Sequence, residues 1–381
     1  MPLDTEVELR AVPVYPELAR FTFAGEKQIV VPDDLLAYAT LVTTTLAASP
    51  RLYAFRTGPS SLANIRSLFG PKPADEPDPW QRVVLDGDGN LSLVASLPGE
   101  AVQALLEQEP GPGSDSVAWM KQAADQEPDI AGVQAMLADA SLAAGDIAMA
   151  EAGARAALAM DPFYPHALRV LAEVALRKND KVRAGQFVAR ALALYPTYAR
   201  AWKIAEMVVG RPIERAAVVE QPFIAVNDEG AVVVVTCDRP FCSGYAACKA
   251  AFRYEPVFRA SVLQESADVP YHLSATEEVV CLQAGLGAHV EARVSNPQAA
   301  HDPTAELLIQ LASEKGLTAF ALFEVLGTYR PEWMRVAPRA IHTAIVQHVH
   351  LRVLGTPSGS LRPLPDKDAG TADTRLFRTG Q

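Results

Sequence analysis

Cysteine is scarce in this chain, and long apolar runs are missing. The 381 residues contain four cysteines, far below the density of a small secreted domain that is held together by disulfides. No apolar run approaches the roughly 18 residues of a membrane-spanning helix. Residues 1–10 have neither the basic start nor the apolar core of a signal peptide. The sequence therefore predicts a cytoplasmic protein with reduced thiols and no membrane segment.

Basic charge is also in short supply. The chain has 34 Lys and Arg against 45 Asp and Glu, which gives a net charge of -11, and its pI is near 5.2. Nucleic-acid binding depends on a concentrated basic face, so this balance argues against nucleic acid as the main partner. Apolar residues make up 49% and charged residues 21% of the chain, as in ordinary soluble globular proteins. The length is sufficient for two or three domains.

The common catalytic motifs are missing as well. The sequence has no phosphate-binding Gly-Lys loop, no nucleophile elbow and no His-Glu-x-x-His, and only an isolated Gly285-x-Gly287 pair. No residue pattern implies a cofactor. We therefore expect a protein without enzymatic activity.

The cysteines are the nearest approach to a chemical site. Cys237, Cys242 and Cys248 are followed by Cys281 at a spacing that fits neither a zinc site nor a common iron–sulfur site, so no metal is predicted. Free cysteines often pack as small buried hydrophobes, and we expect Cys248 and Cys281 inside helices and Cys242 in a loop. The alternative is an enzyme in which Cys242 is a nucleophile with a histidine base. The candidate bases are His272, His289 and His342.

The middle of the chain repeats with a period of 34 residues. Pro128, Pro162 and Pro196 follow this period, and so do the turn pairs that begin at Gly145 and Asn179. Complete units span residues 131–164 and 165–198, with a partial unit on each side. Small residues recur where two helices of a unit would cross closely. They are Ala138, Ala150 and Ala157 in the first unit and Ala172, Ala184 and Ala191 in the second.

This pattern resembles the tetratricopeptide repeat family, whose unit is a helix, a tight turn, an antiparallel second helix and a proline before the next unit. Leu137 and Leu171 match the family's large apolar position, and Trp202 matches the aromatic position that opens a third, incomplete unit. The alternative is an alanine-rich helical bundle without a repeat. The sequence departs from the family at Gln134, Ser141, Ala154 and Ala175, where larger apolar or aromatic side chains are usual.

Charge is unevenly distributed within the repeats. Residues 115–161 carry eight acids and two bases, whereas residues 169–211 carry nine bases and three acids. The resemblance implies that the first helix of each unit lines a concave face, where positions four apart share one side of a helix. We expect this face to bind acidic side chains or a free carboxylate of a partner; the alternative is a solvated surface with one intrahelical ion pair. The candidate partner-binding residues are His166, Arg169, Glu173, Arg177, Arg200 and Lys203.

Two further positions bear on the kind of partner. Similar proteins that grip chaperone tails carry a Lys and an Asn where this chain has Ala135 and Asp139. The difference argues against a chaperone-tail clamp. It also leads us to expect Ala135 on the open face.

The flanking segments predict two mixed domains. Residues 1–113 suggest a small α/β domain with a hairpin over residues 83–86 and 91–95, and residues 213–354 suggest a second mixed α/β domain. In the latter, residues 258–263 and 288–294 could form strands, and Ser274 with Glu277 forms a capping box for a helix that ends near residue 284. Residues 355–381 are rich in Gly, Pro, Ser, Thr and Asp and are expected to be disordered.

These observations predict an α+β multidomain protein in which a tetratricopeptide-like helical solenoid, residues 114–212, lies between two α/β domains. The expected function is a non-catalytic scaffold or adaptor that binds an acidic segment of a protein partner. The alternative is an enzyme with a Cys242 and histidine site, in which the repeats serve oligomerisation or substrate docking.

Overall fold

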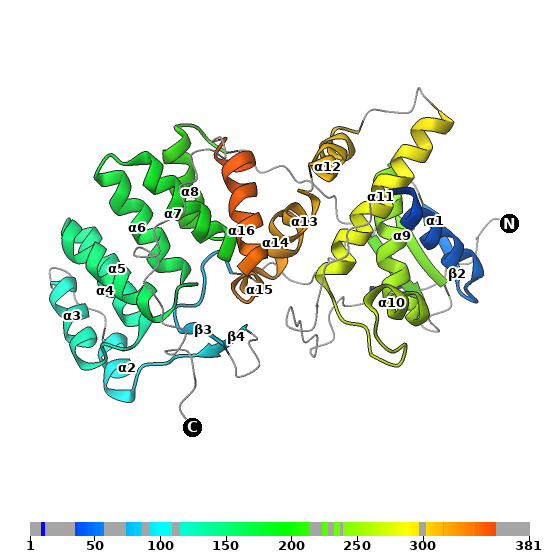
Figure 1. Cartoon of the computed structure of the whole chain (residues 1–381). Helices are drawn as coiled ribbons and strands as arrows, with labels where there is room; N and C mark the ends of the chain where they lie inside the picture. The colour runs from blue at the N-terminus through cyan, green and yellow to red at the C-terminus, as the bar shows by residue number, and fades with distance from the viewer. Residues whose placement is uncertain are drawn as a thin grey trace. The chain divides into compact units, whose positions relative to one another are not determined.

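The computed structural model describes residues 9–11, 35–56, 74–85, 91–108, 115–213, 223–227, 232–236, 239–296, 302–314, 316–337 and 339–355. The chain forms two compact units, one from Met1–Lys72 with Ala216–Tyr329 and the other from Pro73–Arg215 with Arg330–Gln381. Each unit combines helices with a small sheet, so the fold is α+β (Figure 1). No helix in the described ranges is both long and apolar enough to cross a membrane.

A four-stranded sheet joins the two sequence segments of the first unit. Its order is β1 (Leu9–Ala11), β5 (Phe223–Asn227), β6 (Val232–Thr236) and β2 (Leu52–Arg56). β5 is antiparallel to β1 and β6, and β2 is parallel to β6. The expected division into domains of residues 1–113, 114–212 and 213–354 is therefore not observed, because strands from the first and third of these segments share one sheet.

Two helices of the first unit, α9 (Pro240–Tyr254) and α11 (Ala275–Ser295), cross at close range. A Cβ on Gly285 would lie 2.7 Å from the carbonyl oxygen of Phe241, which leaves room only for a glycine. The disulfide Cys248–Cys281 joins the same two helices. Gly285 of the isolated Gly285-x-Gly287 pair thus serves a helix crossing rather than a phosphate site.

The other helices of the first unit pack around or beyond this crossing. α1 (Leu35–Ala48) contacts both α9 and α11, and Val42 and Leu46 of α1 belong to their common apolar core. The remaining elements are α10 (Pro256–Leu263), α12 (Pro303–Ser313), α13 (Leu317–Phe320), the π-helical η2 (Ala321–Leu326) and α14 (Gly327–Tyr329).

Two segments that were expected to be strands are helical. Residues 258–263 belong to α10, which Pro256 starts at its first position, and residues 288–294 belong to α11. The capping box is confirmed, because the Ser274 hydroxyl oxygen accepts the Glu277 amide hydrogen at 3.0 Å. The helix nevertheless continues past residue 284 to Ser295, since the packing of Gly285 against α9 outweighs its low helix propensity.

The second unit contains a hairpin and a row of helices. The hairpin of β3 (Gln81–Leu85) and β4 (Leu91–Ala95) agrees with the prediction. Each helix from α3 to α8 packs against the next along the chain (Figure 1). The helices are α2 (Glu100–Glu107), α3 (Ser116–Gln126), α4 (Ala131–Ala144), α5 (Ile147–Met160), α6 (Pro165–Arg177), α7 (Lys181–Leu194), α8 (Ala199–Val209), α15 (Pro331–Arg335), α16 (Arg339–His348) and the π-helical η3 (Val349–Val353).

The 34-residue period is visible in the turns of this row. Asp146 and Asp180 begin α5 and α7, and each carboxylate accepts the amide hydrogen of the third following residue at 2.9 Å. The residues before them, Gly145 and Asn179, take left-handed φ angles of 88° and 60°, as helix ends often require. Both predicted turn pairs are therefore confirmed.

One side-chain hydrogen bond recurs two periods apart. The Gln134 side-chain nitrogen donates to the carbonyl oxygen of Pro128 at 3.2 Å, and the Trp202 indole nitrogen donates to that of Pro196 at 2.7 Å. Both donors lie six residues after the proline that they contact. Gln134 stands where the family usually has a larger apolar or aromatic residue. Its side chain nevertheless donates the same hydrogen bond as Trp202 does two periods later.

The small residues of the repeats are buried as predicted. Ala138, Ala150, Ala157, Ala172, Ala184 and Ala191 are all 0% exposed. The expectation for Ala135 was wrong, since this residue is 4% exposed and belongs to the core of the helical row.

Close packing at these alanines can be tested on one helix. Ala157→Leu should overpack the interior of the row and lower the free energy of unfolding by about 1–3 kcal/mol. Ala152 is exposed on the same helix, so Ala152→Leu is a matched control and should change little. All four tryptophans belong to the second unit, so urea unfolding followed by tryptophan fluorescence reports the relevant transition. Equal midpoints for both variants would contradict the packing.

Candidate functional site

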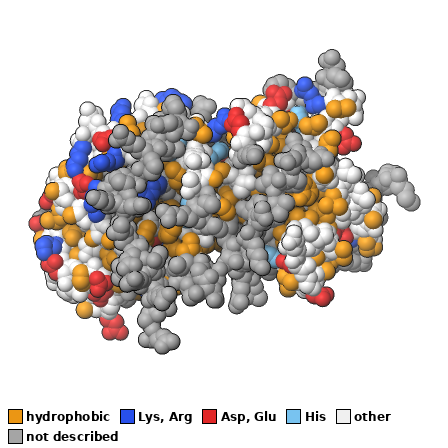
Figure 2. Space-filling model, in the orientation of Figure 1, with side chains coloured by type: hydrophobic (Ala, Val, Ile, Leu, Met, Phe, Trp, Pro, Cys, Tyr) orange, Lys and Arg blue, Asp and Glu red, His pale blue; other side chains and the backbone are white. Residues whose placement is uncertain are grey.

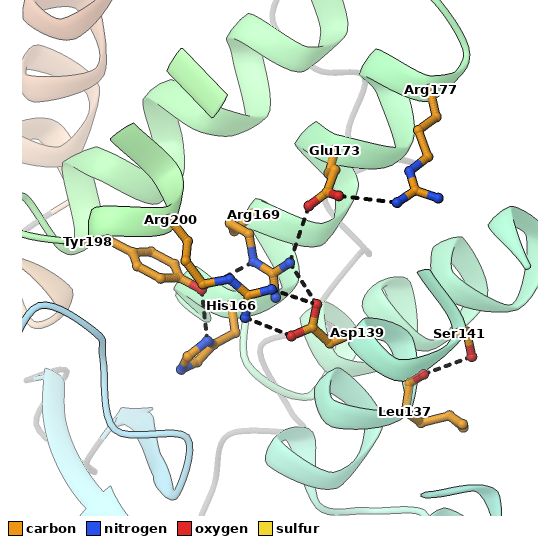
Figure 3. A network of polar contacts seen from close by, with 9 residues as sticks. All are labelled: Leu137, Asp139, Ser141, His166, Arg169, Glu173, Arg177, Tyr198 and Arg200. Atoms are coloured by element: carbon orange, nitrogen blue, oxygen red, sulfur yellow. Dashed lines mark hydrogen bonds and ion pairs between the residues drawn. The ribbon is translucent and has the colours of Figure 1, made fainter. Parts of the chain in front are cut away.

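The expected partner-binding residues lie on α6 and α8, which contact each other. Figure 3 shows a polar network that includes all of them except Lys203, together with Asp139 and Tyr198, which the sequence analysis did not assign to the site. A signal for Asp139 existed, because it stands one 34-residue period before Glu173. The residues on α6 are His166, Arg169, Glu173 and Arg177, and those on α8 are Arg200 and Lys203.

Arg169 lies inside the network rather than on an open surface. It is 1% exposed, and its guanidinium is 2.8 Å from the Asp139 carboxylate and 3.6 Å from that of Glu173. Its Nε also donates to the Tyr198 hydroxyl at 3.2 Å. Arg169 therefore cannot contact a partner as expected, because it is buried itself and its donors face Asp139, Glu173 and Tyr198.

The Asp139 carboxylate pairs with the guanidinium groups of both Arg169 and Arg200. Arg200 donates to both of its oxygens, at 2.8 and 3.1 Å, in the two-point geometry that strengthens Arg–carboxylate pairs. Burial acts to raise the pKa of Asp139, but Arg169 and Arg200 outweigh it and hold the pKa below its usual range. The carboxylate thus stays ionised and joins α4 to both α6 and α8.

His166 ends a directional chain of hydrogen bonds. Its Nε2 lies 2.8 Å from the carbonyl oxygen of Pro77, which can only accept, so this nitrogen carries the hydrogen. Its Nδ1, 2.9 Å from the Tyr198 hydroxyl, then accepts from it. Desolvation lowers the pKa of His166 to about 4, so the ring is neutral at physiological pH. His166 is therefore a neutral hydrogen-bonding residue and not a basic contact for a partner.

Three of the expected bases still present charge to the outside. The Arg200 side chain is 45% exposed beyond its contacts with Asp139, and that of Arg177 is 41% exposed although it is 3.4 Å from Glu173. Lys203 is exposed and has no ion pair with any residue that the structure describes. In the space-filling view basic side chains gather over α6 to α8 (Figure 2).

An irregular segment of the chain itself lies across the starts of α6 and α8. Residues 74–80, which we call the acidic strap, contain neither helix nor strand. Four of its backbone carbonyl groups accept hydrogen bonds from the helical row. The contacts are Tyr195 Oη and Thr197 Oγ1 to the carbonyl of Ala74 at 3.3 and 3.2 Å, the Ala199 amide to Asp75 at 2.9 Å, His166 to Pro77 at 2.8 Å, and Tyr164 Oη to Pro79 at 2.7 Å.

The end of the acidic strap fits against the start of α4. A Cβ on Gly132 would lie 2.5 Å from the carbonyl oxygen of Pro79 and 3.0 Å from the Trp80 ring. Trp80 also packs on the apolar cluster that includes Val102 and Met120. The absence of a side chain at Gly132 therefore allows the strap to approach the helical row closely.

A buried ion pair fixes the chain immediately after the acidic strap. The Asp161 carboxylate accepts the amide hydrogens of Val83 at 3.1 Å and Phe163 at 2.8 Å. Arg335 of α15 lies 2.8 Å from the same carboxylate and donates to the carbonyl of Gln81 at 3.0 Å. Asp161 is 0% and Arg335 1% exposed. This pair ties the hairpin, the end of α5 and α15 together.

The alternative catalytic residue, Cys242, is not where it was expected. It lies within α9, is 5% exposed and takes part in a disulfide, so the prediction of a cysteine in a loop was wrong. Among its candidate bases, His289 is buried in α11 and His342 belongs to the second unit. The structure therefore offers no Cys242 nucleophile.

For Cys248 and Cys281, the predicted burial in helices was right and the predicted reduced state was wrong. Cys248 and Cys281 pack inside helices as expected, and both are 0% exposed. They are bonded to each other rather than reduced. The spacing gave no signal of this pair, because only the crossing of α9 and α11 brings the residues together. No cluster of metal-ligating side chains occurs in the part of the chain that the structure describes.

A second concentration of charge lies in the core of the first unit. Lys249 of α9 pairs with Glu277 and with Glu278, the latter at 2.5 Å. Tyr245 donates to Glu278 at 2.8 Å and Tyr271 to Glu277 at 3.2 Å. Lys249, Glu277 and Glu278 are at most 2% exposed. A substrate cannot reach the cluster in this conformation, so its effect is on stability.

Glu277 makes that stability depend on pH. Its second oxygen, Oε2, has no hydrogen-bond partner among the described residues, and burial raises its pKa to about 7 despite the attraction of Lys249. The folded state therefore binds a proton that the unfolded state, with a pKa near 4.5, has already released. The contribution of Glu277 to the free energy of unfolding is therefore largest below about pH 4.5 and is lost as the pH rises through about 7.

Glu277→Gln should remove this dependence. Between pH 5.5 and 8 the wild type should lose about 1–2 kcal/mol more stability than the variant. Glu291→Gln, exposed on the same helix, should behave like the wild type. The first unit contains no tryptophan, so its unfolding in urea is seen as a change in circular dichroism without a change in tryptophan fluorescence. An unaltered pH dependence in Glu277→Gln would contradict the assignment.

Comparison with known proteins adds no relative to this description. The chain matches no protein-family model, no curated protein and no solved structure. The function is therefore argued from the residues of the helical row alone.

Proposed function

We propose that the chain is a non-catalytic scaffold or adaptor protein, and that its helical row is a short tetratricopeptide-like array that binds an acidic segment of a protein partner. The single observation that carries the proposal is the mode of contact with the acidic strap. Five groups of the row donate to four backbone carbonyls of a segment that forms neither helix nor strand. This is the way in which a surface holds a peptide segment without folding it.

The repeat supports the architecture in this proposal. The caps at Asp146 and Asp180, the left-handed residues before them and the recurring bond of Gln134 and Trp202 all follow a period of 34 residues. A helical bundle without a repeat has no reason to place equivalent contacts at equal spacing. The period therefore favours a solenoid of equivalent units.

The outward charges support the choice of an acidic partner. Arg200 and Lys203 are three residues apart and share one side of α8, and Arg177 extends the charge along α6. Such groups mainly steer an oppositely charged segment and select it over others. Arg169 and His166 contribute indirectly, because they hold Asp139 and Tyr198 in place beneath this surface.

The proposed site of action is the cytoplasm. The scarcity of cysteine favours this compartment, whereas the Cys248–Cys281 bond and the disulfide of Cys242 are unusual for it. The alternative, an enzyme based on Cys242, loses its support with the burial of that residue.

A labelled hexaglutamate peptide is a suitable probe of the surface. It should bind the wild type at low salt and more weakly at 0.2 M salt, where screening is strong over about 10 Å. The double reversal Arg177→Glu with Lys203→Glu should lose about 1–2 kcal/mol of binding, from roughly 0.5–1 kcal/mol for each exposed charge.

The matched control is Lys121→Glu with Lys181→Glu. It changes the net charge of the chain equally, at exposed positions on α3 and α7, and should retain most of the binding. Fluorescence anisotropy at two salt concentrations measures all three proteins. Equal loss in both double variants would show that only the overall charge matters, and the proposed surface would be wrong.

A further inference from the structure

The acidic strap has the chemistry expected of the partner. Its sequence over residues 74–79 is Ala-Asp-Glu-Pro-Asp-Pro, with three carboxylates in six residues. Asp75, Glu76 and Asp78 are all exposed. Partial burial raises the pKa of Glu76, although the charges of Arg200 and Arg169 act to lower it. An acidic segment thus already lies beside the basic surface of the row.

The hydrogen bonds described above between the row and the strap go to backbone carbonyls, while the Trp80 side chain at the end of the strap packs on the apolar cluster. The row donates to carbonyl groups at residues 74, 75, 77 and 79, and every peptide chain carries such groups. Pro77 and Pro79 lack an amide hydrogen and favour an extended backbone, which suits a chain whose hydrogen bonds with the row go to its carbonyls. A different segment with the same backbone shape could therefore occupy the same donors.

We propose that the acidic strap is a built-in ligand of the helical row, and that the partner is an acidic, proline-containing segment that displaces it. This inference rests on the proposed function and states how the strap regulates partner binding. The donors Tyr164, His166, Thr197 and the Ala199 amide serve either chain, but not both at once. The row is then closed to partners while the strap is in place.

The strap has a large advantage because it belongs to the same chain. An attached segment acts at an effective concentration in the millimolar range, and the apparent affinity of a free ligand falls by the fraction of molecules in which the site is open. Weakening the strap should therefore strengthen binding of a free peptide without any change in the donors.

The test uses the full chain and a fluorescein-labelled synthetic peptide with the sequence of residues 74–80. The strap variant is Asp75→Ala, Glu76→Ala and Pro77→Gly, which removes two charges and the buried proline and leaves every donor intact. It should bind the peptide at least about 10-fold more tightly than the wild type. Asp125→Ala with Asp129→Ala, exposed acids outside the strap, removes the same charge and should bind like the wild type.

Two further variants keep the test decisive. Tyr164→Phe, added to the strap variant, removes the donor to the last carbonyl and should reverse part of the gain, which shows that the peptide occupies the place of the strap. If the triple variant loses its cooperative unfolding transition, Glu76→Gln is used instead, because it changes only one exposed side chain. It should give a gain of about 2-fold to 5-fold.

Equal affinity of the strap variant and the wild type would overturn the proposal that the strap closes the site. Absence of peptide binding to a folded strap variant would overturn the proposed ligand. In both cases the hexaglutamate titration against Arg177→Glu with Lys203→Glu still decides whether the basic surface binds an acidic segment, since Arg177 and Lys203 are exposed while the strap is in place.

Discussion

The buried carboxylate of Asp161 is the contact on which the organisation of the second unit depends. It accepts from an amide of β3 and from the Phe163 amide at the end of the first complete repeat unit, and it pairs with the guanidinium of Arg335. A buried charge is tolerated only when it is paired and fully hydrogen-bonded, so these three pieces of chain are stable together and costly to separate. The acidic strap immediately precedes β3. Its course over the helix starts follows from this anchor.

The network around Asp139 changes how the basic half of the row is interpreted. Nine bases between residues 169 and 211 suggest a strongly positive surface, but Arg169 is neutralised inside the protein and His166 is uncharged. Among the expected partner-binding residues, Arg177, Arg200 and Lys203 still present charge to the outside, beside groups that donate to backbone carbonyls. In the proposed function the first group selects for acidity and the second for accessible backbone carbonyls. The acidic strap offers both.

The sequence predicts best what local chemistry decides. Asp146 and Asp180 identify helix starts because a carboxylate there caps free amides, and Ser274 does the same for α11. Contacts between distant residues left no local signal. Asp139 pairs with residues 30 and 61 positions away, and β2 pairs with β6 although residues 73–215 of the second unit lie between them in the sequence. Residues 288–294 form no strand because a helix that is already capped and packed continues through them.

The proposed regulation depends on the contact between the acidic strap and the hydrogen-bond donors of the helical row. Its most direct test is hydrogen exchange at the Ala199 amide, because this amide begins α8 and has no acceptor within its own helix. Its acceptor in the structure is the carbonyl of Asp75, at 2.9 Å. We expect slow exchange at the Ala199 amide in the wild type and fast exchange in the triple variant Asp75→Ala, Glu76→Ala, Pro77→Gly. The exchange rates of amides in the interior of α8 should be the same in both. Exchange at the unprotected rate in the wild type would contradict this contact.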